Sequence, residues 1–82
     1  MFFCPYGTVI KREEDLKQFV SRRNKPEVKV ERFTPSGKDR YCTIVEIATT
    51  AFSGIRYDEY FIAVQKVDDG FEVVKVRKMR SA

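Results

Sequence analysis

Alternation of apolar and polar residues dominates the chain after residue 26 and predicts strands. Residues 27–34 place Val28 and Val30 between polar neighbours, so one side of that strand faces water. Residues 40–50 form the longest run rich in β-branched side chains and contain no Gly or Pro. This run carries apolar side chains at both odd and even positions, and therefore on both of its faces. We therefore expect it to be the central strand of a sheet.

Turn residues separate the remaining predicted strands. Residues 35–38 contain Pro and Gly where a tight turn needs them, so a hairpin leads into the central strand. Residues 57–67 and 71–80 predict two more strands, joined by the hairpin turn Asp68-Asp69-Gly70. Residues 6–10 form a short first strand in this interpretation.

Residues 13–23 predict an amphipathic helix. Leu16, Phe19 and Val20 follow the spacing of one helical face, acidic residues begin the segment and arginines end it. Asn24 and Pro26 end the helix. The predicted fold is therefore α+β: one short amphipathic helix packed on a four- to five-stranded antiparallel meander, in the order β-α-β-β-β-β.

Composition sets the size and charge of this fold. The 82 residues, 43% of them hydrophobic, are enough for a single domain over residues 1–82 with one modest core. Sixteen Lys and Arg against twelve Asp and Glu give a net charge of +4, which permits anionic partners, although many neutral binders share it. High charge with few Asn and Gln is typical of thermophile proteins. The first residues lack the basic and long apolar regions of a signal peptide, and no run could span a bilayer, so we expect a cytoplasmic protein without membrane contact.

The cysteines leave two interpretations open. Cys4 and Cys42 match no zinc motif, and with no His in the chain we expect no metal site. They are either two buried, inert thiols or a disulfide that ties the N-terminal segment to the central strand.

Two stretches are candidates for binding. The connection over residues 50–58 is longer than a minimal hairpin turn and presents Phe52 and Tyr57 beside Arg56, a combination that suits contact with bases or with a protein. Alternatively, Phe52 and Ile55 fold back to close the end of the core.

The second stretch is the basic end of the last strand. Strict alternation places Lys75 and Arg77 on one face and Lys78 and Arg80 on the other, and Lys66 on the neighbouring strand adds to the possible phosphate contacts. The alternative is a solvated edge strand, whose charges prevent edge-to-edge pairing.

A third basic group consists of Arg22, Arg23 and Lys25. We interpret these residues as complements of the helix dipole and as a solvated face.

Catalysis has little support in the sequence. There is no His base, no nucleophile in a recognisable setting and no phosphate-binding Gly loop, so we expect neither an enzyme nor a cofactor nor a small-molecule substrate.

The first hypothesis is a non-enzymatic nucleic-acid-binding domain, with structured RNA or a ribonucleoprotein preferred over duplex DNA. Aromatic residues interleaved with Arg and Lys suit stacking better than groove insertion. A helix followed by antiparallel strands resembles the first part of a double-stranded-RNA-binding domain, but that domain closes with a helix and this chain with a strand. The alternative is a protein-interaction or homodimerisation module, supported by the small size, by Phe2 and Phe3, and by edge strands that can pair.

Overall fold

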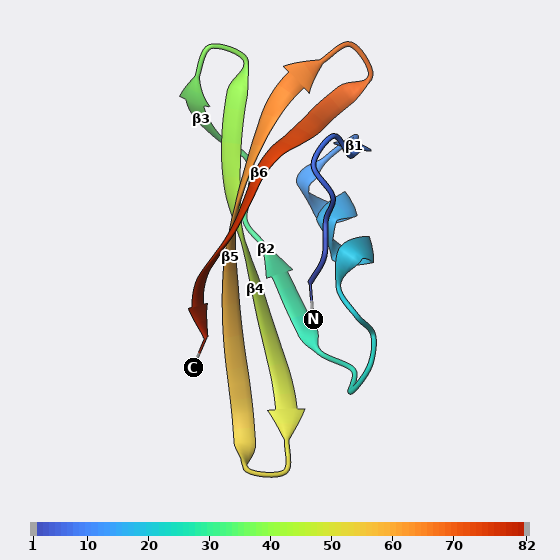
Figure 1. The fold of residues 1–82 in the computed structure, drawn as a ribbon, viewed down its shortest axis with the longest axis vertical. Helices are drawn as coiled ribbons and strands as arrows, with labels where there is room; N and C mark the ends of the chain where they lie inside the picture. The colour runs from blue at the N-terminus through green and yellow to red at the C-terminus, as the bar shows by residue number, and fades with distance from the viewer. Residues whose placement is uncertain (1, 82) are drawn as a thin grey trace.

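The structure, a computed structural model, describes residues 2–81 and is mostly β, with 62% of residues in strands and 9% helical. Its elements in chain order are β1 (Val9–Ile10), the 3-10 helix η1 (Glu13–Phe19), β2 (Glu27–Val30), β3 (Thr34–Gly37), β4 (Arg40–Ala51), β5 (Gly54–Val67) and β6 (Gly70–Ser81). The described strands belong to one antiparallel sheet that curls strongly into a half-barrel (Figure 1). The predicted α+β class is therefore wrong, because the single short helix covers only part of a sheet that makes up most of the chain.

The long strands β4, β5 and β6 form the body of the sheet. The strand order is β1-β6-β5-β4-β2, and β3 also pairs with β4. The predicted strand over residues 27–34 ends early, because β2 stops at Val30. β3 contains residues 35–37, which were predicted as part of the turn, and the turn itself lies at residues 38–39. β2 pairs with residues 45–48 and β3 with residues 40–42 of β4. At the break, the buried hydroxyl of Thr43 donates a hydrogen bond to the carbonyl of Glu31. β4 is interior as predicted, but β5 occupies the middle of the sheet.

Only one face of the sheet packs on the N-terminal segment, and we call it the inner face; the opposite one is the outer face. The register places Val45 opposite Tyr60 and Thr43 opposite Ile62 on the inner face. In Figure 1 the N-terminal segment and η1 lie along one side of the sheet. The Phe2 ring contacts Tyr60 with a centroid distance of 5.0 Å. The buried hydrophobic residues that form the core are Phe2, Cys4, Ile10, Leu16, Val20, Val45, Ile47, Tyr60, Ile62, Val64 and Val73.

The helical segment is shorter and tighter than predicted. η1 is a 3-10 helix of seven residues that ends at Phe19, and Val20 already forms a β-bridge with Phe2. Three residues per turn stack Leu16 and Phe19 over Glu13, and all three are buried or half-buried, as is Asp15. The carboxylate of Asp15 accepts a hydrogen bond from the Lys11 amide at 2.9 Å and so fixes the start of the helix.

The predicted connection over residues 50–58 is not a loop. Ala51 pairs with Gly54, which leaves Phe52 and Ser53 as a two-residue turn, and residues 54–58 belong to β5. The alternation of Ile55 and Tyr57 with polar residues continues the strand, so the hairpin extends beyond the core. Phe52 and Ile55 are both exposed and do not fold back to close the core.

Candidate nucleic-acid interface

Two irregularities in β6 decide which faces its basic residues occupy. The register shifts near Val74, which lies between the pairs Val73–Val64 and Lys75–Ala63, and again near Met79. Each shift inserts one extra residue, a β-bulge, and reverses the alternation of side chains beyond it.

Because of the second bulge, the arrangement of the β6 bases differs from the predicted one. Lys75 pairs with Ala63, Arg77 with Phe61 and Arg80 with Glu59, so all three bases lie on the outer face. Lys78 pairs with Tyr60 and lies on the inner face. The prediction that Arg80 shares a face with Lys78 was wrong, because strict alternation allows no bulge at Met79.

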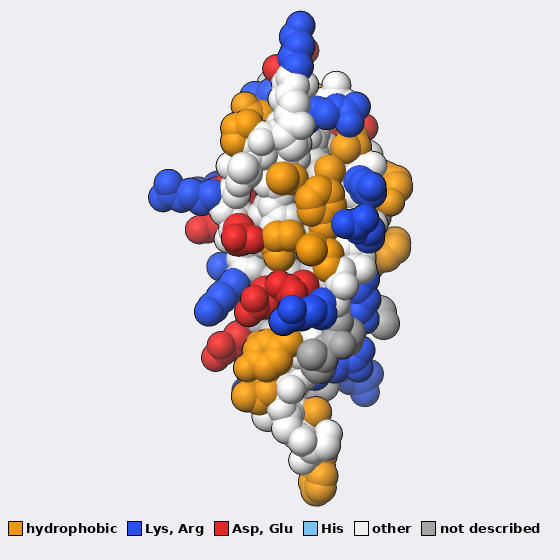
Figure 2. Space-filling view, turned by 90° about the vertical axis from the view of Figure 1, so that its left-hand side faces the viewer, with side chains coloured by type: hydrophobic (Ala, Val, Ile, Leu, Met, Phe, Trp, Pro, Cys, Tyr) orange, Lys and Arg blue, Asp and Glu red, His pale blue; other side chains and the backbone are white. Residues whose placement is uncertain are grey.

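Apolar side chains occupy the middle of the outer face. Cys42 lies opposite Ala63, and Ile44 lies opposite Phe61, and all four are half-buried. The guanidinium carbon of Arg77 lies 5.6 Å from the centroid of the Phe61 ring, within range of a cation–π contact. Figure 2 shows hydrophobic side chains gathered in the middle of this face, with basic side chains along both margins and acidic ones among them on the left.

A row of charged residues crosses the outer face next to this apolar centre. Glu46 lies directly opposite Glu59, with Lys29 beyond Glu46 and Arg80 beyond Glu59. Two carboxylates facing each other across neighbouring strands repel. The flanking bases offset this repulsion, and Arg80 Nε lies 3.4 Å from Glu59 Oε1. Arg80 is exposed and Glu59 is half-buried, so replacing Glu59 by another anion as the partner of Arg80 costs little on the Arg80 side.

The β4–β5 hairpin continues the outer face with two exposed apolar residues and an exposed tip. Tyr57 lies opposite Ala48 and Ile55 opposite Thr50, with 45% and 56% of their surfaces exposed. Phe52 is fully exposed at the turn. The predicted stacking residues Tyr57 and Phe52 are therefore accessible, and Tyr57 shares its face with the three β6 bases.

The other predicted contact residues lie elsewhere. Arg56 Nε and Lys78 Nζ lie 3.5 and 3.6 Å from the same carboxylate oxygen of Asp58 on the inner face. Lys66 lies at the other end of β5, where its Nζ is 5.2 Å from the centroid of the Phe71 ring. The structure thus places Lys75, Arg77, Arg80 and Tyr57 on the same face of the sheet, and it separates Arg56, Lys66 and Lys78 from them.

Phe61 is the residue of this surface that sequence reasoning missed. The sequence places it in the heart of an apolar strand, and its neighbours Tyr60 and Ile62 are buried on the inner face. Because side chains alternate along a strand, Phe61 points to the face opposite that of Tyr60 and Ile62. This alternation is the signal that could have identified Phe61 as an outer-face residue.

The cysteines are free thiols on opposite faces of the sheet. Cys4 lies in the core, whereas Cys42 lies on the outer face, so the structure contains no Cys4–Cys42 disulfide. Burial raises the pKa of the Cys4 thiol above its ordinary value of 9.0, and a hydrogen bond with the Thr8 side chain opposes this shift.

Metal ligands do not gather anywhere in residues 2–81. Within this range, no group of three or more His, Cys, Asp or Glu side chains could hold a metal ion. No helix there is both long and apolar enough to cross a membrane.

Comparison of the chain with protein-family models, curated proteins and solved structures finds no match. The candidate interface is therefore defined by the geometry of the chain's own residues.

Proposed function

We propose that this protein is a non-enzymatic RNA-binding domain that contacts a structured RNA with the outer face of its sheet. The observation that carries the proposal is the alignment produced by the β6 bulges. Lys75, Arg77 and Arg80 lie on one face, beside the half-buried ring of Phe61 and on the same side as Tyr57. Positive side chains next to accessible rings supply the phosphate and base contacts that RNA-binding sheets need.

The alternative explanation of these bases is edge protection. Among the described strands, β1 covers only the start of β6, and the basic part of β6 lies at the edge of the sheet. Charges on an edge strand prevent unwanted pairing. Edge protection does not require three bases on one face beside a half-buried aromatic ring, and this alignment supports RNA binding.

Structured RNA fits this surface better than duplex DNA. An exposed Tyr on a curved sheet can stack on a base only when that base is unpaired, as in the loops and bulges of folded RNA. The described part of the outer face is formed by three long paired strands rather than by a helix or a two-stranded ribbon of the kind that enters a major groove, and only the tip of the β4–β5 hairpin has the ribbon form. Under this proposal the three bases contact phosphates and Tyr57 stacks.

The proposal is tested by measuring affinity for a fluorescent RNA stem-loop and for duplex DNA at two salt concentrations. If three phosphates are contacted, raising salt fourfold lowers the RNA affinity roughly twenty- to fortyfold. The stem-loop should also bind more tightly than the duplex at both concentrations. Absence of binding at low salt would refute the proposal.

A second candidate function is homodimerisation through the outer face. The observation that favours it is the apolar centre around Ile44 and Phe61, which is only half-buried within residues 2–81. Sedimentation separates the two functions. A stable dimer that does not bind polyanions supports dimerisation, whereas a monomer retained on heparin supports RNA binding.

A further inference from the structure

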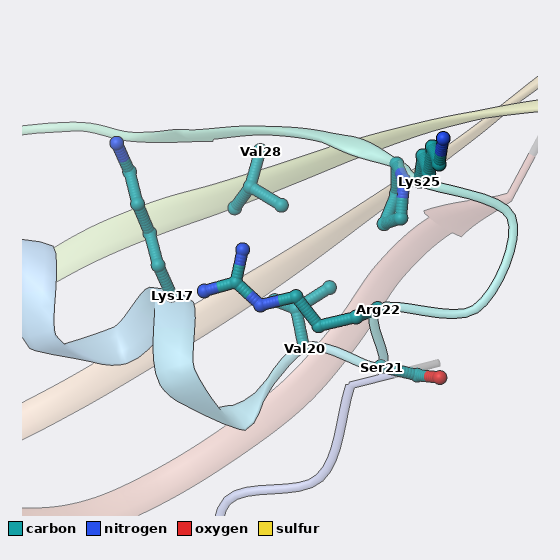
Figure 3. Close-up of a pocket in the computed structure, with 7 residues that line it drawn as sticks. Lys17, Val20, Ser21, Arg22, Lys25 and Val28 are labelled. Atoms are coloured by element: carbon teal, nitrogen blue, oxygen red, sulfur yellow. The ribbon is translucent and has the colours of Figure 1, made fainter.

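A basic hollow lies between the end of η1 and β2, on the side of the sheet opposite the candidate RNA surface. Its volume is about 510 Å³, which is within the usual range of small-ligand sites. Three bases, Lys17, Arg22 and Lys25, line it together with the apolar residues Val20, Pro26 and Val28. Figure 3 shows the guanidinium of Arg22 directed back toward Lys17, with Val20 and Val28 beside it and Lys25 at the other end.

No acidic residue in the described part of the chain lines this hollow, although Glu27 and Glu46 line an adjoining one together with Lys25. Within residues 2–81, none of the three bases forms an ion pair. Three cations around one concave surface repel one another and attract an anion.

The backbone that presents Arg22 and Lys25 is a tight turn in an unfavourable conformation. The Lys25 amide donates to the Arg22 carbonyl at 3.1 Å, and Asn24 and Lys25 have φ values of 67° and 45°. The left-handed region suits Asn but is uncommon for Lys. Because η1 ends at Phe19, the expected role of Arg22 as a complement of the helix dipole does not apply.

We propose that this hollow binds a small phosphate monoester with an aromatic or apolar body. The phosphate is held between Lys17 and Arg22, since a guanidinium binds two phosphate oxygens at once. The body of the ligand covers Val20 and Val28. This site is independent of the proposed RNA-binding function, because it lies on the other side of the sheet and uses other residues.

The test uses NMR spectra of the nitrogen-15-labelled protein titrated with three probes: phenyl phosphate, inorganic phosphate and benzyl alcohol. Phenyl phosphate should shift the amide signals of residues 21–25 and 28 and saturate. Inorganic phosphate should shift the same signals at least about threefold more weakly, because it buries no apolar surface. Benzyl alcohol, which has no charge, should produce no saturable shift. Equal binding of inorganic and phenyl phosphate, or shifts centred on the β6 bases, would overturn the proposal.

A matched pair of variants tests the role of Arg22. Arg22→Gln should weaken phenyl phosphate binding by about tenfold or more, because it removes a charge-assisted contact. Arg23→Gln removes the same charge from an exposed neighbour that does not line the hollow, and should change binding by no more than about twofold. Equal weakening by both variants would show a general charge effect and overturn the site.

A competition experiment with RNA distinguishes the small-molecule site from the proposed RNA surface. Saturating the protein with the RNA stem-loop should leave the phenyl phosphate shifts unchanged, and displacement of phenyl phosphate by RNA would contradict a separate small-molecule site. Failure of RNA to bind would not alter the phenyl phosphate result.

Discussion

Gly70 joins the last hairpin to the N-terminal segment. Its φ of 147° lies in a region that side chains rarely adopt, and a Cβ at this position would collide with the carbonyl oxygen of Ile10. The hairpin turn was predicted from the Asp-Asp-Gly pattern, but the close approach of Ile10 depends on tertiary structure that the pattern does not contain.

Gly70→Ala should therefore lower the free energy of unfolding by about 2 kcal/mol or more, through backbone strain and the displacement of β1. Gly54→Ala is a matched control, because Gly54 has a φ of 132° but no atom lies within 4 Å of the point that its Cβ would occupy. It should cost only about 1 kcal/mol, from strain alone. Urea unfolding measures both values, and equal losses would argue against the contact with Ile10.

The two cysteines should differ strongly in reactivity. A thiol whose pKa is raised by burial has less thiolate, and Cys4 is also covered by the core, whereas Cys42 is half-buried on the outer face. Near pH 8, iodoacetamide should modify Cys42 at least about tenfold faster than Cys4. The variant Cys42→Ser should retain only the slow reaction. A single fast rate for both thiols would contradict the burial of Cys4.

The Cys4 thiol also makes the free energy of unfolding depend on pH. Its pKa is higher in the folded protein than in the unfolded chain, so folding favours the protonated form. The contribution of Cys4 to stability is complete below the ordinary pKa of 9.0 and is lost as pH rises from that value through the folded pKa. Cys4→Ala should remove this alkaline loss in urea unfolding measured against pH. An unchanged pH profile in Cys4→Ala would assign the loss to other groups.

At the scale of elements, the long strands follow from local pattern, but their irregularities do not. Residues 40–50 and 57–67 were predicted as strands, and β4 and β5 include both. A β-bulge adds one residue without requiring Gly or Pro, and neither Val74 nor Met79 carries a local signal for it. The faces of the β6 bases, and with them the candidate site, could therefore not be assigned from alternation alone.

The 3-10 helix is held by packing rather than by its own propensity. A single 3-10 stretch of seven residues is marginal in isolation, and the fully buried Leu16 anchors it to the sheet. Spacing found the apolar face but could not distinguish an α-helix from a 3-10 helix, because Leu16 and Phe19 fit both.

Leu16→Ala should lower the free energy of unfolding by about 2 to 5 kcal/mol, since it leaves a cavity under η1. Gln18→Ala, at an exposed position of the same helix, should change it by less than about 0.5 kcal/mol. Urea denaturation followed by circular dichroism measures both. A loss below about 1 kcal/mol for Leu16→Ala would show that η1 does not contribute to the core.

At the scale of the whole molecule, residues 2–20 cover one face of the sheet and leave the other uncovered (Figure 1). The sequence identified a small basic protein with most of its strands, but it assigned too large a share to the helix. The sequence could not show that the outer face has its own apolar centre. Both β4 and β5 carry apolar residues on both faces, and a strand with this pattern is expected to be buried on both sides. The same ambiguity explains why Phe61 was not predicted to lie on the candidate interface.

We propose that RNA binding depends on the outer-face bases and not on net charge. This dependence is tested by comparing two triple variants in which each base is changed to Gln: one at Lys75, Arg77 and Arg80, the other at Arg12, Arg23 and Arg32. Each triple removes three positive charges, and the residues of the second belong neither to the outer-face bases nor to the hollow beside η1.

The measurement is RNA stem-loop affinity across a salt series for the two triple variants and the unmodified protein. We predict that the outer-face triple weakens binding at low salt by at least about tenfold and reduces the slope of log affinity against log salt by about 2, while the second triple changes affinity by no more than about twofold. Equal weakening by both triples, or an unchanged slope in the outer-face triple, would contradict RNA binding through this face.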